Sequence, residues 1–289
     1  MVFGLGSGVD FTYIFYYLAD KSRYIFTRNP VFENSLLDNL GMNSKWYHGD
    51  KLELEFIKSN LDKEIPVLLW TDPACLHFFK TNTPSFAAHT LVLIGHDEKG
   101  FYISDSISEE ILHASYSEIE YAANVAKPPF YKRNVFLPIE NFTIRNLEEC
   151  VKKSLKSNAQ HMLSNNPYRG IDAIKRLIDE IIEWKNVSNY FNICLDAYRS
   201  MELIGTGGAG FRNLYTDFLI EVEEKQLISP KYQFSTKMNH ISKLYKNLSK
   251  SFYLAGVKKS DRYLKKIQFI LIEIYENETA FWTEVSLME

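Results

Sequence analysis

Apolar positions change their spacing near the middle of this chain. In the first half they form short runs separated by polar turns, a pattern typical of strands and short helices. From about residue 143 onward they recur every three or four positions, a pattern typical of amphipathic helices. The sequence therefore predicts an α+β protein with a mixed part over residues 1–142 and an all-α part over residues 143–289.

Glycine, proline and polar residues bound most of the expected elements. In the first part we expect strands over residues 11–18, 66–70 and 134–138, and helices over residues 34–40, 51–60 and 117–125. Ser117 is the expected N-cap of the last of these helices. In the second part we expect helices over residues 170–185, 196–203, 211–224, 238–254 and 260–276.

A hairpin over residues 89–105 is the clearest local signal. Two apolar runs flank the polar turn Asp97-Glu98-Lys99-Gly100, so we expect two antiparallel strands. His89 opens the first strand and Asp105 closes the second, which returns both side chains to one edge of the sheet. The carboxylate can accept the imidazole N–H there and leave the other ring nitrogen as a base. The pair is typical of thiol-dependent acyl transfer, and two structural residues at strand ends are the alternative.

The three cysteines are widely spaced and odd in number. This usage predicts a reducing compartment, with neither a disulfide framework nor a zinc motif. Cys150 and Cys194 lie on helical patterns and are expected to be small core residues. Cys75 is the only cysteine in the first part, and it is the candidate nucleophile within this sequence.

Composition agrees with an ordinary globular protein, because 46% of the residues are hydrophobic and 24% are charged. No apolar run is long enough to cross a bilayer, and no basic segment followed by a long apolar one stands at the N-terminus. We therefore expect a cytoplasmic protein with no membrane or nucleic-acid partner, and the oligomeric state stays open.

Charge is distributed unevenly along the chain. The net charge is −3, yet residues 231–266 hold ten Lys and Arg residues against the single acid Asp261, so this segment carries +9 and the remainder −12. Lys258, Arg262, Lys265 and Lys266 are expected to form an exposed positive surface on the last long helix. Such a segment is either a solvated helix face or a docking surface for an acidic partner.

A glycine-rich run spans residues 205–210 and matches the letters G-x-G-x-x-G. The dinucleotide fingerprint needs a preceding strand, whereas the residues before this run have a helical pattern. The run is instead expected to cap the following helix or to bind an anionic group, with Gly207, Gly208 and Arg212 beside the anion. A second run over residues 4–8 is expected to form a tight turn.

Three motifs in this order resemble the butirosin-biosynthesis H-type proteins over nearly the whole chain. They are Phe3-Gly4-Leu5-Gly6-Ser7-Gly8 with the aromatic run after it, the hairpin over residues 89–105, and the segment over residues 205–219. The resemblance implies a papain-like N-terminal domain with an antiparallel sheet, followed by a helical domain. It implies transfer of an acyl group from an acyl carrier protein to a small amine in natural-product biosynthesis, with His89 as general base and Asp105 as its orienting partner. No metal or separate cofactor is implied, since the acyl group would travel on the phosphopantetheine of the carrier.

The resemblance also implies a nucleophilic cysteine on a helix that precedes Phe3. Met1 stands two residues before that position, so three explanations stay open: a start site placed too far downstream, a natural loss of activity, or a replacement nucleophile such as Cys75. Whether the chain is an enzyme therefore stays open as well. A non-catalytic binding protein of the same fold and a cysteine peptidase are the alternatives, because the same triad attacks thioesters, esters and amides.

Overall fold

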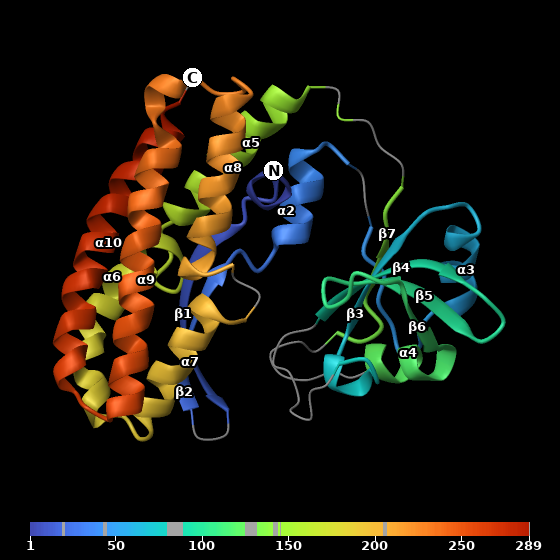
Figure 1. Cartoon of the computed structure of the whole chain (residues 1–289), viewed down its shortest axis with the longest axis horizontal. Coiled ribbons are helices and arrows are strands. Elements are labelled where there is room, and N and C mark those ends of the chain that lie inside the picture. Colours follow the sequence, from blue (N-terminus) through green and yellow to red (C-terminus); the bar gives the residue numbers. More distant parts are fainter. Residues whose placement is uncertain are drawn as a thin grey trace. The chain divides into compact units, whose positions relative to one another are not determined.

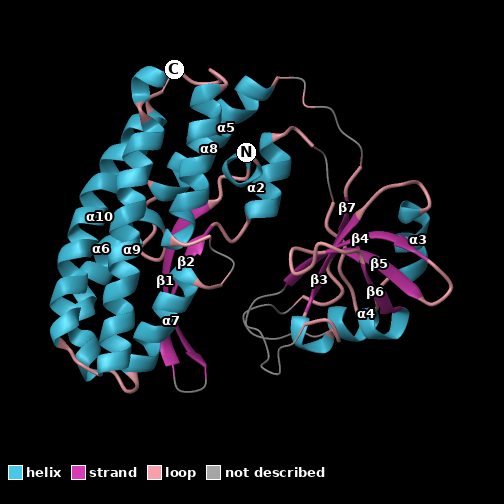
Figure 2. Ribbon diagram, viewed as in Figure 1, coloured by secondary structure: helices cyan, strands magenta, loops and turns pink. Residues whose placement is uncertain are grey.

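The computed structural model describes residues 1–18, 21–42, 45–79, 89–124, 132–140, 144, 146–204 and 207–288. The chain forms two compact units. The helical unit comprises Met1–Gly41 and Ile144–Glu289, and the sheet unit comprises Met42–Thr143 (Figure 1). Figure 2 shows an antiparallel sheet with helices in the sheet unit and mostly helices in the helical unit, so the expected α+β class is confirmed.

Long amphipathic helices build most of the helical unit. A two-stranded antiparallel hairpin packs with them. The elements of this unit are α1 (Val2–Leu5), β1 (Val9–Leu18), β2 (Lys21–Arg28), α2 (Phe32–Asn39), α5 (Leu147–Met162), α6 (Gly170–Glu180), α7 (Tyr190–Glu202), α8 (Arg212–Glu224), α9 (Phe234–Lys258) and α10 (Arg262–Ser286). Helices α9 and α10 follow each other across a short turn and pack side by side (Figure 1).

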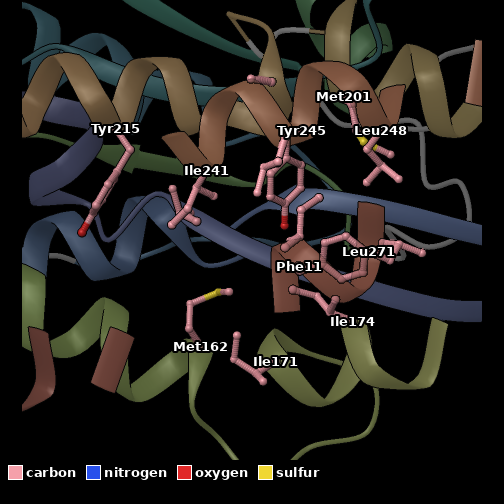
Figure 3. Close-up of a cluster of buried hydrophobic side chains, with 14 of the residues drawn as sticks. Phe11, Met162, Ile171, Ile174, Met201, Tyr215, Ile241, Tyr245, Leu248 and Leu271 are labelled. Atoms are coloured by element: carbon pink, nitrogen blue, oxygen red, sulfur yellow. The ribbon is translucent and has the colours of Figure 1, made fainter. Parts of the chain in front are cut away.

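Strand β1 belongs to the core of the helical unit. Val9, Phe11 and Tyr13 lie on one face of the strand and are fully buried, and Asp10 on the other face is fully buried as well. Figure 3 shows Phe11 close to Tyr245 of α9 within this core. The sheet unit ends at Thr143, and the expected division into residues 1–142 and 143–289 stays a prediction. Residues 1–41 belong to the helical unit, and their aromatic strand is buried among its helices.

The sheet unit is a five-stranded antiparallel sheet in the order β6-β5-β4-β3-β7. Its elements are α3 (Leu54–Leu61), β3 (Val67–Thr71), β4 (His89–His96), β5 (Gly100–Ser104), β6 (Leu112–Ser115), α4 (Tyr116–Ala123) and β7 (Phe136–Pro138). One sheet face carries apolar residues at alternate positions, such as Leu69, Leu91 and Ile103, and packs with Ile57 of α3 and Ile119 of α4. The His89–Asp105 hairpin therefore lies at the centre of this sheet.

The sequence pattern did not predict β2 and β6. In β2 the polar residue Thr27 is buried while Phe26 is 42% exposed, so the apolar pattern does not reveal the inward face. Strand β6 has four residues at the edge of its sheet, too few for a clear alternation. The expected cap of α4 was wrong by two residues: Ser115, not Ser117, is the N-cap and accepts the backbone N–H of Glu118 at 3.3 Å.

The glycine-rich segment near the N-terminus allows close packing rather than only a turn. Residues Val2–Leu5 form the single-turn helix α1. A Cβ atom on Gly4 would lie 2.0 Å from the ring of Phe218, and one on Gly6 would lie 2.3 Å from the ring of Phe32. Glycine is needed at both positions because aromatic side chains occupy the space that a larger residue would fill.

Residues 207–211 form an unusual left-handed loop before α8. Their φ angles are 58° for Gly207, 82° for Gly208, 54° for Ala209, 55° for Gly210 and 68° for Phe211. Glycine adopts positive φ readily, whereas Ala209 and Phe211 are strained in this region. The positive φ angles therefore explain the three glycines among these five residues. The loop places the next residue, Arg212, in the core.

Arg212 is completely buried and joins four parts of the helical unit. Its Nε donates to Glu278 Oε1 of α10 at 2.8 Å, and its Nη1 donates to the carbonyls of Asp10 in β1 and Gly210 in the loop, both at 2.9 Å. The guanidinium carbon lies 4.0 Å from the ring centroid of Tyr245 in α9. Burial raises the pKa of Glu278, and the neighbouring guanidinium opposes this rise. A charge this deep requires such partners, so the arginine acts as a structural hub.

Replacing Arg212 with Met should lower the free energy of unfolding by about 3–5 kcal/mol, because the Glu278 carboxylate loses its buried partner. Urea denaturation followed by circular dichroism measures this loss. Lys225→Met is the matched control: it breaks the exposed Lys225–Glu221 ion pair of 2.6 Å and should cost less than about 1 kcal/mol. The double variant Arg212→Met/Glu278→Leu should be more stable than Arg212→Met alone. Equal stability of Arg212→Met and Lys225→Met would contradict the hub role.

Candidate functional site

Strand pairing brings His89 and Asp105 to one end of the sheet. His89 is the first residue of β4 and pairs with Thr71, the last residue of β3. On the other side of β4, Ser104 of β5 pairs with Val92, so Asp105 follows the last paired residue of β5. Because side chains alternate along a strand, His89 and Asp105 share the face of the buried apolar residues. They lie where that apolar face ends.

The predicted contact between His89 and Asp105 is confirmed. His89 Nε2 lies 2.6 Å from Asp105 Oδ2, while Asp105 Oδ1 accepts the backbone N–H of Ile107 at 2.9 Å. The Asp105 side chain is only 2% exposed, whereas that of His89 is 29% exposed. The ring of Phe79 contacts the imidazole edge to face, with centroids 4.8 Å apart. The carboxylate is thus fixed by a backbone donor and the imidazole by the carboxylate and an aromatic ring.

This geometry suits general base chemistry at the second ring nitrogen. A carboxylate that accepts the N–H of Nε2 leaves the lone pair of Nδ1 able to take a proton from a thiol or an amine. Partial exposure of His89 keeps the ring accessible, and burial of Asp105 keeps its orientation constant. The arrangement can therefore deprotonate a nucleophile, although His89 and Asp105 do not themselves supply one.

Cys75 lies in the loop that follows β3, at the same end of the sheet as His89. It ends the short 3₁₀ turn Pro73–Cys75. Asp72 caps this turn, because its side chain accepts the backbone N–H of Ala74 at 2.9 Å. Next to it, Glu118 of α4 accepts the backbone N–H of His77 at 2.7 Å. The loop is therefore held at both ends. Cys75 itself is half-buried against the sheet-unit core.

The other two cysteines lie in the helical unit and none of the three is in a disulfide. Cys194 is fully buried, as expected, and burial raises the pKa of its thiol to about 12. Cys150 is half-buried on α5 against the helical core. Cys75 is therefore the one cysteine of the chain that shares a unit with His89 and Asp105.

At the other end of the same hairpin, Asp97 organises the turn. It accepts the backbone N–H groups of Lys99 and Gly100 at 2.7 and 2.9 Å, and these two bonds are the main reason that the pKa of its carboxyl lies well below the usual value. Its second oxygen accepts the hydroxyl of Tyr102 at 3.0 Å. Asp97 of the Gly-His-Asp sequence thus has a structural role in the turn, and His89 remains the candidate catalytic residue of this hairpin.

The glycine loop does hold an anionic group, but that group belongs to the chain itself. The backbone N–H of Ala209 donates to the carboxylate of Glu202 at 3.1 Å, and Gly207 accepts the side-chain amide of Asn213 at 3.0 Å. Arg212 is paired with Glu278 and is closed to solvent. The expected external anion site at Gly207, Gly208 and Arg212 is therefore occupied by internal carboxylates. Gly205 lies outside the described residues.

The basic residues of the sequence prediction lie where two helices meet. Lys258 is the last residue of α9, and Arg262 and Lys265 stand in the first turn of α10. All three are exposed. The predicted surface therefore involves both helices rather than the last one alone, since Lys258 precedes the turn between them.

An open cavity of about 770 Å³ lies in the helical unit, away from these residues. It is lined by α5, by the end of α8 and by the segment after α8, including Glu148, Glu223 and Tyr232. Neither His89, Asp105 nor Cys75 lines it. Among the described helices, none combines the length and the apolar character required to cross a bilayer.

Comparison with known proteins gives two family matches that together span most of the chain. A family model described as Butirosin biosynthesis protein H, N-terminal, matches residues 1–106. A second model, described as a domain of unknown function (DUF4872), matches residues 117–285. Among solved structures, that of a C39-like peptidase from Bacillus anthracis has 14% sequence identity and a TM-score of 0.30, with 42% of this chain and 64% of that chain covered. None of the curated proteins matches.

Replacing Asp105 with Ala should release the loop that follows β5. The backbone N–H of Ile107 loses its acceptor and His89 loses its partner, so we expect faster hydrogen exchange at Ile107 and a loss of about 1–3 kcal/mol in unfolding free energy. Asp105→Asn keeps a carbonyl acceptor and should show a smaller effect on both measurements. Unchanged exchange at Ile107 in Asp105→Ala would show that the carboxylate does not order this loop.

Proposed function

The chain belongs to the butirosin biosynthesis protein H family, and we propose that it is an acyltransferase-like protein acting on carrier-protein thioesters. The acyl group would pass from the phosphopantetheine of an acyl carrier protein to a small amine and form an amide. The observation that supports this proposal is the 2.6 Å contact between the half-exposed His89 and the buried Asp105. The papain-like fold implied by the sequence uses such a pair in thiol-dependent acyl transfer.

The proposed reaction has two steps with a covalent intermediate. In the first, a thiolate attacks the thioester carbonyl, the carbon–sulfur bond to pantetheine breaks, and the pantetheine thiol leaves with a proton from the imidazolium of His89. In the second, the amine attacks the acyl-enzyme while His89 takes the amine proton, so the amide forms, the carbon–sulfur bond to the enzyme breaks, and the enzyme thiolate is released beside the imidazolium. Asp105 keeps the ring orientation through both steps and stabilises the charged imidazolium.

Within residues 1–289, the thiol nucleophile has less support than His89 and Asp105. Cys75 has the right unit and the right end of the sheet, but the carboxylate of Asp72 caps the same short turn. A thiolate is favoured by a nearby cation or a helix N-terminus, and a neighbouring carboxylate opposes it. The family resemblance assigns the nucleophile to a cysteine that precedes Phe3. We therefore propose His89 and Asp105 as catalytic residues and keep Cys75 as the replacement thiol to be tested.

Two other functions use the same fold. A non-catalytic protein would hold a carrier or a peptide without attacking it. A cysteine peptidase would use the same pair of residues on a peptide bond, because one triad can attack several acyl derivatives. Thioester turnover separates the first alternative from acyl transfer, and release of peptide fragments separates the second.

Residues 1–289 alone should turn over acyl-pantetheine thioesters poorly. Removing the nucleophile from a triad costs on the order of 10⁶-fold in rate, and we expect a deficit of that order relative to a longer chain that carries the upstream cysteine. Intact mass spectrometry of the acyl-enzyme and release of pantetheine thiol are the measurements. In the longer chain, His89→Ala should abolish transfer while circular dichroism shows an unchanged fold.

Cysteine variants complete this experiment. A rapid acyl adduct on residues 1–289 that disappears in Cys75→Ser, but persists in Cys150→Ser, would contradict the expectation and identify Cys75 as the nucleophile. Cys194 serves as an internal control because its buried thiol, with a pKa raised to about 12, should resist iodoacetamide in the folded protein. Binding of a carrier without turnover in any chain would support the non-catalytic alternative.

A further inference from the structure

Positive charge gathers at the turn that joins α9 to α10. Helix α9 contains five lysines and no acidic residue along its 25 positions. Lys258 and Lys259 end it, and Arg262, Lys265 and Lys266 begin α10, with Asp261 as the one acid between them. All five cations are exposed, and none forms an ion pair with a residue that the structure describes. We call these five residues and Phe269 the basic tip.

Helix stability explains Lys258 at the C-terminus of α9, but it does not explain the three cations at the start of α10. The N-terminus of a helix carries the positive end of the macrodipole and favours acidic side chains. Helix α10 has no acidic residue in its first turn and instead has Arg262, Lys265 and Lys266 within its first five positions. These three cations therefore oppose the dipole of their own helix. A negatively charged partner would relieve both this opposition and their mutual repulsion.

An aromatic side chain stands beside these cations. Phe269 is 72% exposed, among the most exposed of the large apolar residues, and follows Lys265 and Lys266 by one helical turn. The opposite side of α10 is buried, as shown by Leu264 and Leu271. An exposed aromatic ring surrounded by charge has the composition of a protein–protein interface, where an aromatic anchor is enclosed by a polar rim.

We propose that the basic tip is a docking surface for an acidic protein. The choice of partner rests on the proposed function, in which that protein is the carrier of the acyl group. The patch is short: after Phe269 the exposed residues Glu273 and Glu276 reverse the charge on the same helix. A compact acidic surface contacts the five cations without reaching Glu273 and Glu276, whereas a long duplex or a flat anionic bilayer would meet these two glutamates. Charge complementarity of this kind speeds encounter and selects the partner.

Direct binding tests the proposal without requiring catalysis. A carrier protein with phosphopantetheine but no acyl group is titrated into residues 1–289 by calorimetry, at low and at physiological salt. The variant Arg262→Glu/Lys265→Glu/Lys266→Glu should bind at least about tenfold more weakly and with a smaller salt dependence. Phe269→Ala should also weaken binding about tenfold, but should leave the salt dependence unchanged because no charge is altered.

A matched variant separates this surface from general electrostatics. Lys243→Glu/Lys246→Glu/Lys250→Glu makes the same change in net charge at exposed positions of α9 outside the basic tip, and should reduce affinity much less. Equal losses in both triple variants, or no binding by the wild-type protein, would overturn the proposal. So would tighter binding to phosphatidylglycerol vesicles or to duplex DNA than to the carrier. Binding that depends on the tip, without thioester turnover either in residues 1–289 or in the longer chain, would refute the acyl transfer and leave the docking surface in place.

Discussion

A buried guanidinium is the constraint on which the helical unit depends. Arg212 has five N–H donors and no access to water, so carbonyl and carboxylate oxygens must surround it. Those oxygens come from β1, from the left-handed loop and from α10, while an aromatic ring of α9 covers the plane of the group. The glycines before Arg212 adopt positive φ readily and so allow the left-handed loop that turns this side chain inward. The loop thus matches the sequence of a phosphate-binding motif, but its role is to place Arg212 in the core of the helical unit.

In the sheet unit, strand alternation places the polar residues of the candidate site. There, the strict alternation of strand side chains extends the apolar face by one position on each of two neighbouring strands, and those positions hold His89 and Asp105. The apolar core beneath them excludes water from the carboxylate, and the end of the sheet exposes the imidazole. A general base needs an accessible ring, and its orienting partner needs a fixed carboxylate; the partly exposed His89 and the buried Asp105 meet these two requirements.

Local features of this protein could be predicted from sequence, and distant ones could not. The hairpin over residues 89–105 is encoded within itself, because its apolar runs and polar turn set both the strands and the meeting of His89 with Asp105. The partners of Arg212 are different: Asp10 and Glu278 stand 202 and 66 positions away, and no periodicity links them. Strand β1 was recognised as a strand, yet an alternating pattern does not say which core receives its buried face. The roles of the catalytic candidates stay predictions for the same reason, since a thiol can reach a sheet edge from anywhere in the chain.

The helical unit is assembled from two separate stretches of sequence, with the sheet unit inserted between them. During synthesis on the ribosome, Met42–Thr143 emerges as one continuous piece whose sheet contacts are all internal. The β1–β2 hairpin precedes this piece, but the residues that bury its aromatic side chains follow it: Tyr13 packs with Trp184 after α6, and Phe11 packs with Tyr245 of α9. The hairpin therefore keeps part of its aromatic face uncovered until α9 leaves the ribosome, so it precedes the sheet unit in synthesis and reaches its native surroundings after it.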